Sequence, residues 1–222
     1  MKILIPIVIG LLVVGCGDGS KVVPNDPNVE AAIETAIREV IKKPEGELTN
    51  EDFGNIKWLE VNNLGISDVT VLGKLTQLQS ELDLRNNRIN NISPLSNLTK
   101  LEVLWLYGNN IEDISPLSEL KKLTRLYLGG NEIRDVYALK GLHELTLLGL
   151  GDNNIKDVSS LSELKQLENL SLSSNKISDI KPLAKLKQLK ELDLRANPDL
   201  TKSQITELQK ALPKCKIMHT AK

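Results

Sequence analysis

The chain of 222 residues has few of the side chains from which disulfide scaffolds and metal centres are built. Two cysteines and two histidines are too few for a disulfide framework or a cluster of zinc ligands. The histidines, His143 and His219, have no cysteine at zinc-ligand spacing, and no phosphate-binding glycine loop or nucleophile elbow is present. The sequence therefore predicts a protein that is not an enzyme and that needs no cofactor or metal ion.

Aromatic residues and an excess of charge are also scarce. Phe, Trp and Tyr together make up 3% of the chain, and 28 basic residues stand against 29 acidic ones. Without a basic excess the chain has no electrostatic field that would attract nucleic acid or anionic lipid. We therefore expect no nucleic-acid partner.

What the sequence has in abundance is a repeat. An asparagine preceded by a Leu-x-Leu pair returns every 22 residues, at Asn87, Asn109, Asn131, Asn153, Asn175 and Asn197. A fixed period of this length is typical of a solenoid, in which each repeat is one coil stacked on the next. Leu-x-Leu alternation predicts a short strand with one buried face, and strands at constant spacing stack in parallel. The predicted fold is an α/β solenoid with a curved parallel sheet on its concave face.

Each coil also carries turn residues. The asparagine amide can donate to and accept from backbone groups that a buried turn leaves unpaired. Ser93-Pro94 and Ser115-Pro116 are typical of a helix N-cap followed by proline at the first helical position. About eight residues remain for the convex side of a coil, which favours a 3₁₀ turn over an α-helix.

The chain divides into one repeat domain with two caps. Residues 29–56 are predicted to form an N-terminal helical cap that Asp26-Pro27 opens, residues 57–200 the repeats, and residues 201–222 a C-terminal cap helix and last strand. Thr201 and Gln204 form a capping box at the start of that helix. Cys215 takes the place of a repeat leucine, which predicts a buried structural thiol. One extra residue near positions 79–81 predicts a bulge or a shifted strand.

The pattern L-x-x-L-x-L-x-x-N-x-I-x-D-I-x-P-L over residues 57–200 resembles the bacterial leucine-rich repeat proteins of the internalin type. The helical segment before the repeats is also similar to the N-terminal cap of that family. The resemblance implies a curved parallel sheet whose concave face binds proteins. No sorting motif follows the last repeat, so the chain differs from the surface-attached members in its expected anchor.

The N-terminus predicts export. Lys2 precedes an apolar run at residues 3–14, which at about a dozen residues is shorter than the ~20 needed to span a bilayer. Residues 13–16, Val-Val-Gly-Cys, resemble a bacterial lipobox, which implies a signal peptide at residues 1–15 and lipidation of Cys16. The alternative is an ordinary signal peptide cleaved near Gly15. Residues 16–28 form a linker, and the expected location is the bacterial cell membrane or the outer membrane.

The concave surface is the expected binding site. In each x-L-x-L-x strand the leucines point inward and the x residues face the concave side, where Gly129, Gly149 and Gly151 leave a shallow floor beside several rings. Three large rings offer roughly 450–750 Å² of surface, and Trp, Tyr and Arg are typical of binding hot spots. The predicted partner-binding residues are Val103, Trp105, Tyr107, Arg125, Tyr127 and Leu147. We expect a monomer that binds a protein partner.

Two alternatives to protein binding remain for these rings. Trp and Tyr faces also hold sugar rings, so the chain could be a glycan-binding module. The rings could instead stack on each other and only shield the sheet. Trp58, on the first strand, is weaker evidence of binding because it could pack under the cap helix, and Tyr137 is assigned to the convex side.

An acidic cluster offers the one route to catalysis. Glu81 and Asp83 stand two residues apart on one strand, with Cα atoms about 6.5–7 Å apart, beside Glu60. This spacing lies within the range of paired carboxylates in glycoside hydrolases, and a weak calcium site is a second possibility. A solvated acidic rim that Arg85 partly balances is the simplest reading. Glu191, Asp193 and Arg195 repeat the arrangement near the other end.

Overall fold

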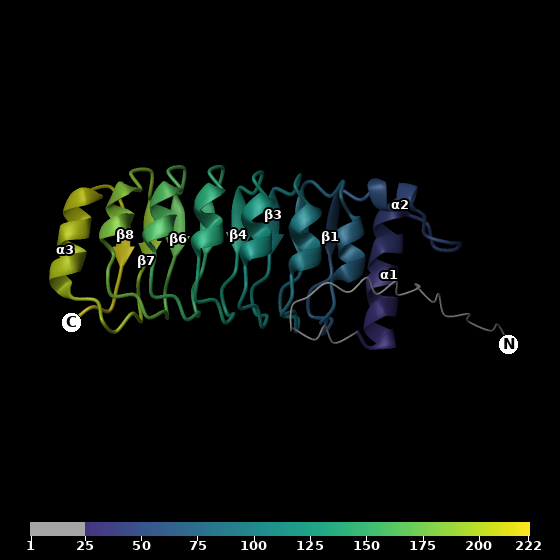
Figure 1. Cartoon of the computed structure of the whole chain (residues 1–222), viewed down its shortest axis with the longest axis horizontal. Helices are drawn as coiled ribbons and strands as arrows, with labels where there is room; N and C mark the ends of the chain where they lie inside the picture. Colours follow the sequence, from purple (N-terminus) through teal and green to yellow (C-terminus); the bar gives the residue numbers. More distant parts are fainter. Residues whose placement is uncertain (1–24) are drawn as a thin grey trace.

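The computed structural model describes residues 25–222 (Figure 1). The predicted signal peptide at residues 1–15, Cys16 and the linker up to residue 24 lie outside the described residues. Among the described helices, none combines the length and the apolar character that crossing a membrane requires.

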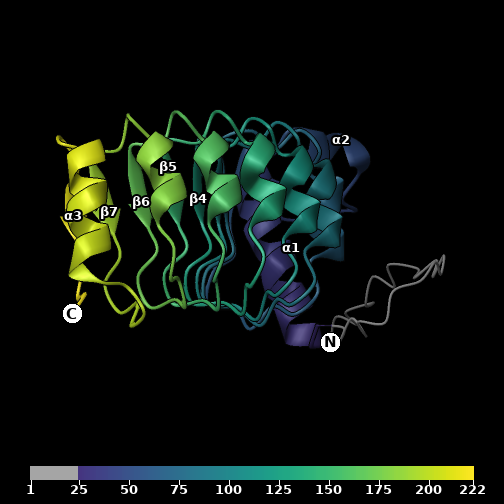
Figure 2. The same cartoon turned by 60° about the vertical axis from the view of Figure 1, so that its left-hand side comes forward.

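Eight short parallel strands form a single sheet in chain order. Leucines of neighbouring strands lie opposite each other, as Leu104 does with Leu126, so each coil repeats the register of the coil before it. The two views in Figures 1 and 2 show the coils side by side along one axis, with the strands on one side and helical turns on the other. The strands are β1 Trp58–Glu60, β2 Glu81–Asp83, β3 Val103–Trp105, β4 Arg125–Tyr127, β5 Leu147–Gly149, β6 Asn169–Ser171, β7 Glu191–Asp193 and β8 Lys216–Met218.

The side opposite the sheet consists of short 3₁₀ helices, one in each coil from the first to the sixth. They are η1 Thr70–Lys74, η2 Ser93–Asn97, η3 Ser115–Glu119, η4 Tyr137–Gly141, η5 Ser159–Glu163 and η6 Lys181–Lys185. This confirms the predicted leucine-rich repeat architecture, in which a coil has too few residues left for an α-helix.

The serines of the Ser-Pro pairs do not cap these helices, so that prediction was wrong. Ser115 is already the first residue of η3, and the N-cap is Ile114, whose side chain is buried in the core. The Ser115 amide instead donates to Asp113 Oδ1 over 2.8 Å. The same bond recurs in the other coils, which explains the repeated acidic residue at Asp68, Asp135, Asp157 and Asp179 and the asparagine that replaces it at Asn91.

The repeated asparagines form the predicted ladder. Asn131 is buried, its amide group donates to the carbonyls of Leu106 and Leu128, and its Oδ1 accepts from the Ile111 amide. The ladder continues in the next coil, where Asn153 Oδ1 accepts from the Ile133 amide. Each asparagine therefore joins its own coil to the coil before it.

Helices close both ends of the stack (Figure 1). The helix α1, Pro27–Ile41, begins at the N-cap Asp26, and Ile33 and Ile37 on its inner face are buried. A short helix α2, Asn50–Gly54, follows with a capping box at Thr49. At the other end α3, Lys202–Ala211, has the capping box of Thr201 and Gln204 and buries Ile205 and Leu208.

The last coil also buries Cys215, as the repeat pattern predicts. Its side chain is 4% exposed and belongs to the continuous apolar core. Burial raises the pKa of this thiol, and the nearby Glu191 carboxylate raises it further. Cys215 therefore behaves as a small apolar residue and not as a reactive thiolate.

Residues 25–28, which the sequence assigned to the linker, are held in the fold. Asn25 Oδ1 accepts from the amides of Ser67 and Asp68, and the Asn25 amide group donates to the Asp68 carbonyl. Pro27 already lies in α1. This anchor ties the start of the described chain to the first coil.

The extra residue before β2 is absorbed as a local irregularity next to the strand. In a regular coil two successive amides share one carbonyl of the coil before, whereas the amides of Glu102 and Val103 donate to two carbonyls, those of Gln79 and Ser80. Beyond this point Leu59 lies opposite Leu82, so the leucine register is unbroken. Residues at the same concave position on successive strands form a column along the sheet. The insertion leaves these columns intact.

Candidate binding site on the concave face

The register of the sheet brings the predicted aromatic residues together. Trp105 on β3 lies opposite Tyr127 on β4, and their rings stack with centroids 3.6 Å apart and an interplanar angle of 1°. Neighbouring strands are about 4.8 Å apart, so the two rings lean together to reach stacking distance. The stack therefore runs along the axis of the solenoid.

Two further contacts fix Trp105. The Arg85 guanidinium, from the coil before β3, lies 4.7 Å from the centre of the indole ring. The indole Nε1 donates to Glu81 Oε1 over 2.5 Å. A cation–π contact and a hydrogen bond to a carboxylate both restrict the ring, so Trp105 is held in place before any partner arrives.

The other predicted contact residues differ in accessibility. Tyr107 is 49% exposed, Arg125 is exposed and Leu147 is partly buried. Val103 is only 4% exposed, so its placement in the partner surface was wrong. It is a short side chain between the longer side chains of Glu81 and Arg125 in the same column, and sequence alone does not give their conformations.

A shallow groove of about 290 Å³ lies beside the rings. Its floor is formed by the glycines that sequence analysis placed there, and a Cβ on Gly129 would lie 3.1 Å from Tyr107 Cδ2. Tyr107 therefore lies across a position that has no side chain. The lining residues are Arg85, Trp105, Tyr107, Tyr127, Gly129, Gly149, Gly151, Asp152, Ser171 and Ser173.

Besides Arg85 and the three floor glycines, three lining residues were not among the predicted binding residues. Ser171 and Ser173 follow the rings in their columns, on β6 and just after it, and their hydroxyl oxygens lie 3.5 Å apart. Asp152 lies in the turn after β5 with φ of 54°. The signal for the serines was their column position, whereas nothing in the repeat pattern marks Asp152.

The acidic cluster is committed to structural contacts. Asp83 is 1% exposed, and its carboxylate accepts from the Arg85 amide, from Arg85 Nε and Nη2 and from the Asn62 amide group. Burial acts to raise the pKa of Asp83, but these hydrogen bonds and the Arg85 charge outweigh burial and lower that pKa. Asp83 therefore orients Arg85 toward Trp105.

Asp193 and Arg195 repeat this pair at the other end of the sheet. Asp193 accepts from the Arg195 amide, Nε and Nη2, and the hydrogen bond from the Arg195 side chain is the main cause of its lowered pKa. An ionised carboxylate that is fully engaged in this way is not poised for proton transfer. Within residues 25–222 no group of three or more His, Cys, Asp or Glu side chains is arranged to hold a metal ion.

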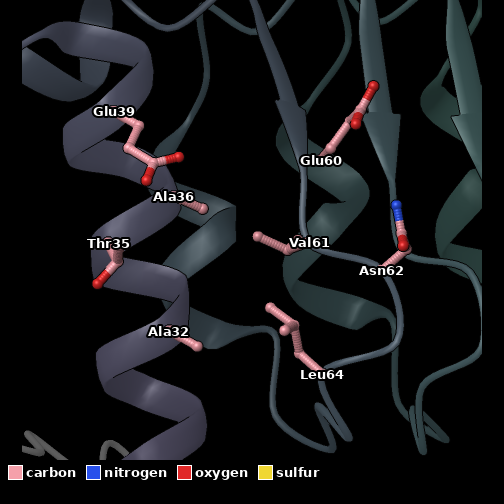
Figure 3. Close-up of a pocket in the computed structure, with 8 residues that line it drawn as sticks. All are labelled: Ala32, Thr35, Ala36, Glu39, Glu60, Val61, Asn62 and Leu64. Carbon is pink, nitrogen blue, oxygen red and sulfur yellow. The ribbon is translucent and has the colours of Figure 1, made fainter.

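A second, wider hollow of about 460 Å³ lies where α1 meets β1 (Figure 3). Ala32 and Ala36 line it from the helix, Val61 and Leu64 from the first coil, and Glu39 and Glu60 stand toward one end.

Trp58 does not pack under α1, since 49% of its surface is exposed. Tyr137 is 58% exposed on η4, away from the sheet, as predicted.

Comparisons with known proteins agree with this architecture. The family described as "Leucine Rich repeats (2 copies)" matches residues 80–119 and 165–210. Internalin C2 of Listeria monocytogenes is 30% identical, with a TM-score of 0.65 over 85% of this chain and 92% of that one. No curated protein sequence matches the chain.

Two other solved structures resemble this chain, and both belong to chains of which only a part is matched. A second Listeria monocytogenes internalin is 27% identical, with a TM-score of 0.67 over 86% of this chain and 62% of its own. A leucine-rich repeat protein of Leptospira interrogans is 28% identical, with a TM-score of 0.64 over 69% of this chain and 40% of its own. The repeat fold is thus shared by proteins that extend beyond the part this chain matches.

Proposed function

We propose that this chain, which belongs to the leucine-rich repeat proteins and is built like the internalins, binds a protein partner through the concave face of β3–β5. Leucine-rich repeat proteins generally mediate protein–protein interactions, and their curved sheets provide extended binding surfaces. The proposed contact residues are Trp105, Tyr107, Arg125, Tyr127 and Leu147.

The observation that carries this proposal is the pre-arranged stack of Arg85, Trp105 and Tyr127. Tryptophan, tyrosine and arginine are the residues enriched at binding hot spots, and ordering them before binding lowers the entropy cost of association. Tyr107 and Arg125 remain exposed beside the stack. Rings that served only to shield the sheet would not leave Tyr107 half exposed.

A double variant, Trp105→Ala with Tyr127→Ala, tests the proposal. Both side chains lie outside the leucine core, so the variant should keep the circular dichroism spectrum of the repeat fold. We expect it to lose the proteins that the wild type captures from extracts. Ser160→Ala on the convex side serves as the matched control, and capture of the same partners by the double variant would refute the concave-face assignment.

Glycan binding is the second candidate, and the polar wall of the groove is the observation behind it. Ser171, Ser173 and Asp152 give one wall hydroxyl and carboxylate groups, which suit sugar hydroxyls. A glycan array probed with the wild type and the double variant separates the two candidates. Glycan signals that disappear in the double variant, without any captured protein, would favour this second function.

The proposed location is the outside of a bacterial membrane. The support is the sequence alone: the apolar run at residues 3–14 and the lipobox-like residues 13–16, which end in Cys16. A lipid on Cys16 and a short linker would keep the repeat domain close to the membrane surface.

We propose a binding protein without catalytic activity, because the carboxylates that suggested hydrolysis, Glu81 and Asp83, are engaged by Trp105 and Arg85.

A further inference from the structure

The ring stack ends abruptly at Tyr127. The next residue in the same column, on β5, is Gly149, and the one after it, on β6, is Ser171. A Cβ on Gly149 would lie 3.6 Å from Tyr127 Cδ1, so the space above this glycine borders the tyrosine ring directly. Tyr127 therefore has Trp105 against one face and the groove against the other.

The width of the groove selects what can enter it. Tyr127 and Ser171 are two strands apart, which corresponds to roughly 9.6 Å. One ring stacked about 3.6 Å from Tyr127 would lie above β5 and leave roughly 6 Å to the Ser171 column, a gap that a polar substituent can bridge. Two stacked rings would need about 10.8 Å and would not fit.

We propose that this groove takes one aromatic side chain of the protein partner, a tyrosine or tryptophan, which continues the stack above Gly149. The inference rests on the proposed function, namely that the partner is a protein. The ring face packs on Tyr127, and the phenol or indole donor points toward Ser171, Ser173 and Asp152. A phenylalanine would fill the same space but would leave this polar wall without a partner.

Charge complementarity defines the surroundings of that ring. Arg125 is the one charged residue at the concave positions of β3–β6, and it is exposed and forms no ion pair in the described chain, while Asp152 lines the groove from the turn after β5. It lies on β4 two residues before Tyr127, with Leu147 opposite it on β5. The partner segment should therefore carry a carboxylate next to its aromatic residue.

The polar groups favour an aromatic side chain over a sugar ring. Of the polar side chains that line the groove, Ser171 and Ser173 share a hydrogen bond between their hydroxyls, and Arg85 is held by Asp83. Few free groups are left for the many hydroxyls of a pyranose. The open face of Tyr127, parallel to Trp105 within 1°, instead offers a flat surface to another planar ring.

The test uses Gly149→Leu, which fills the space above β5 without removing a ring. The Cβ site has only ordinary contacts, the nearest at 3.6 Å, so the variant should fold; its circular dichroism and urea midpoint verify this. The probes are the capped peptide Gly-Asp-Tyr-Gly, its Phe and Ala versions, and methyl β-glucoside. Binding is followed by NMR through the indole N–H resonance of Trp105. The variant Trp58→Phe assigns this resonance, because it removes the other of the two tryptophans.

The wild type should bind the Tyr peptide, the Phe peptide about fivefold more weakly and the Ala peptide without detectable shift. Gly149→Leu should weaken the Tyr peptide at least about tenfold, and Arg125→Ala should weaken it about threefold. Equal binding by wild type and Gly149→Leu, no peptide binding by the wild type, or binding of the glucoside alone would each overturn the proposal.

Partner capture separates this inference from the proposed function. If Gly149→Leu retains a captured partner that Trp105→Ala with Tyr127→Ala loses, ring insertion fails and the concave-face function stands. If both variants retain the partner, both proposals fail. Loss in both variants, together with the peptide results above, supports ring insertion.

Discussion

The indole N–H of Trp105 donates a 2.5 Å hydrogen bond to the Glu81 carboxylate on the preceding strand. Glu81, which the sequence suggested as a catalytic carboxylate, therefore orients Trp105, which the sequence suggested as a binding residue. The arrangement leaves the faces of the indole for Arg85 and Tyr127, so that a binding surface is ordered by groups that lie within its own columns.

We expect Glu81→Ala to weaken partner binding by about three- to tenfold, because Trp105 loses a charge-assisted hydrogen bond that orients its ring. Glu81→Gln should lose less, since its amide oxygen still accepts from the indole. Titration of the captured partner with both variants checks this. Equal effects of the two substitutions would show that the charge of Glu81, and not its hydrogen bond, matters for binding.

Asn131→Ala should lower the free energy of unfolding by about 2–3 kcal/mol, since it leaves the buried Ile111 amide without a partner and removes one of the two hydrogen bonds to the carbonyls of Leu106 and Leu128. Urea unfolding followed by circular dichroism measures the loss. The control is Asn110→Ala, an exposed neighbour that should stay within about 0.5 kcal/mol of the wild type. Similar losses for both variants would contradict the role of the ladder.

The Asp52 carboxylate predicts an acid-sensitive N-terminal cap. Its hydrogen bond from Lys43 and those from Thr49 lower the pKa of Asp52 from 3.8 to about 2. Because the folded-state pKa is the lower one, ionised Asp52 stabilises the fold above about pH 4, and this contribution is lost as the pH falls toward about 2. Asp52→Asn should therefore be less stable than wild type at about pH 6, with a gap that narrows by about pH 2.5.

Urea unfolding at those two pH values measures that gap. Glu51→Gln is the matched control, because Glu51 lies exposed in the same helix and forms no ion pair in the described chain. An Asp52→Asn gap that is the same at both pH values would rule out the ionised carboxylate as its cause.

Cys16→Ala should release the protein from membranes into the soluble extracytoplasmic fraction, because the proposed lipid on Cys16 is its anchor. Fractionation of cells that express each form, followed by immunoblotting, reports the distribution. Cys215→Ala is the control, since that thiol is buried and takes no lipid. Continued membrane association of Cys16→Ala would reject the anchor.

The solenoid, the leucine core, the asparagine ladder and both caps follow from the order of the residues alone. These features depend on local rules that repeat every 22 residues, such as alternation in a strand and the hydrogen-bonding capacity of an asparagine at a turn. The register also followed, because a strand shifted by one residue would turn its leucines to solvent. Position in the repeat therefore sufficed to place Trp105 beside Tyr127.

The contacts and the exposure of the concave side chains, in contrast, depend on the folded structure. Val103 is buried although its column faces outward, Asp83 is committed to Arg85, and the Asp113 side chain, not a serine, accepts from the first amide of η3. These outcomes depend on side-chain conformations between coils, where a rotamer on one strand decides what its neighbours can reach. The period gives every coil the same backbone, whereas contacts between unlike side chains differ at each step along the sheet.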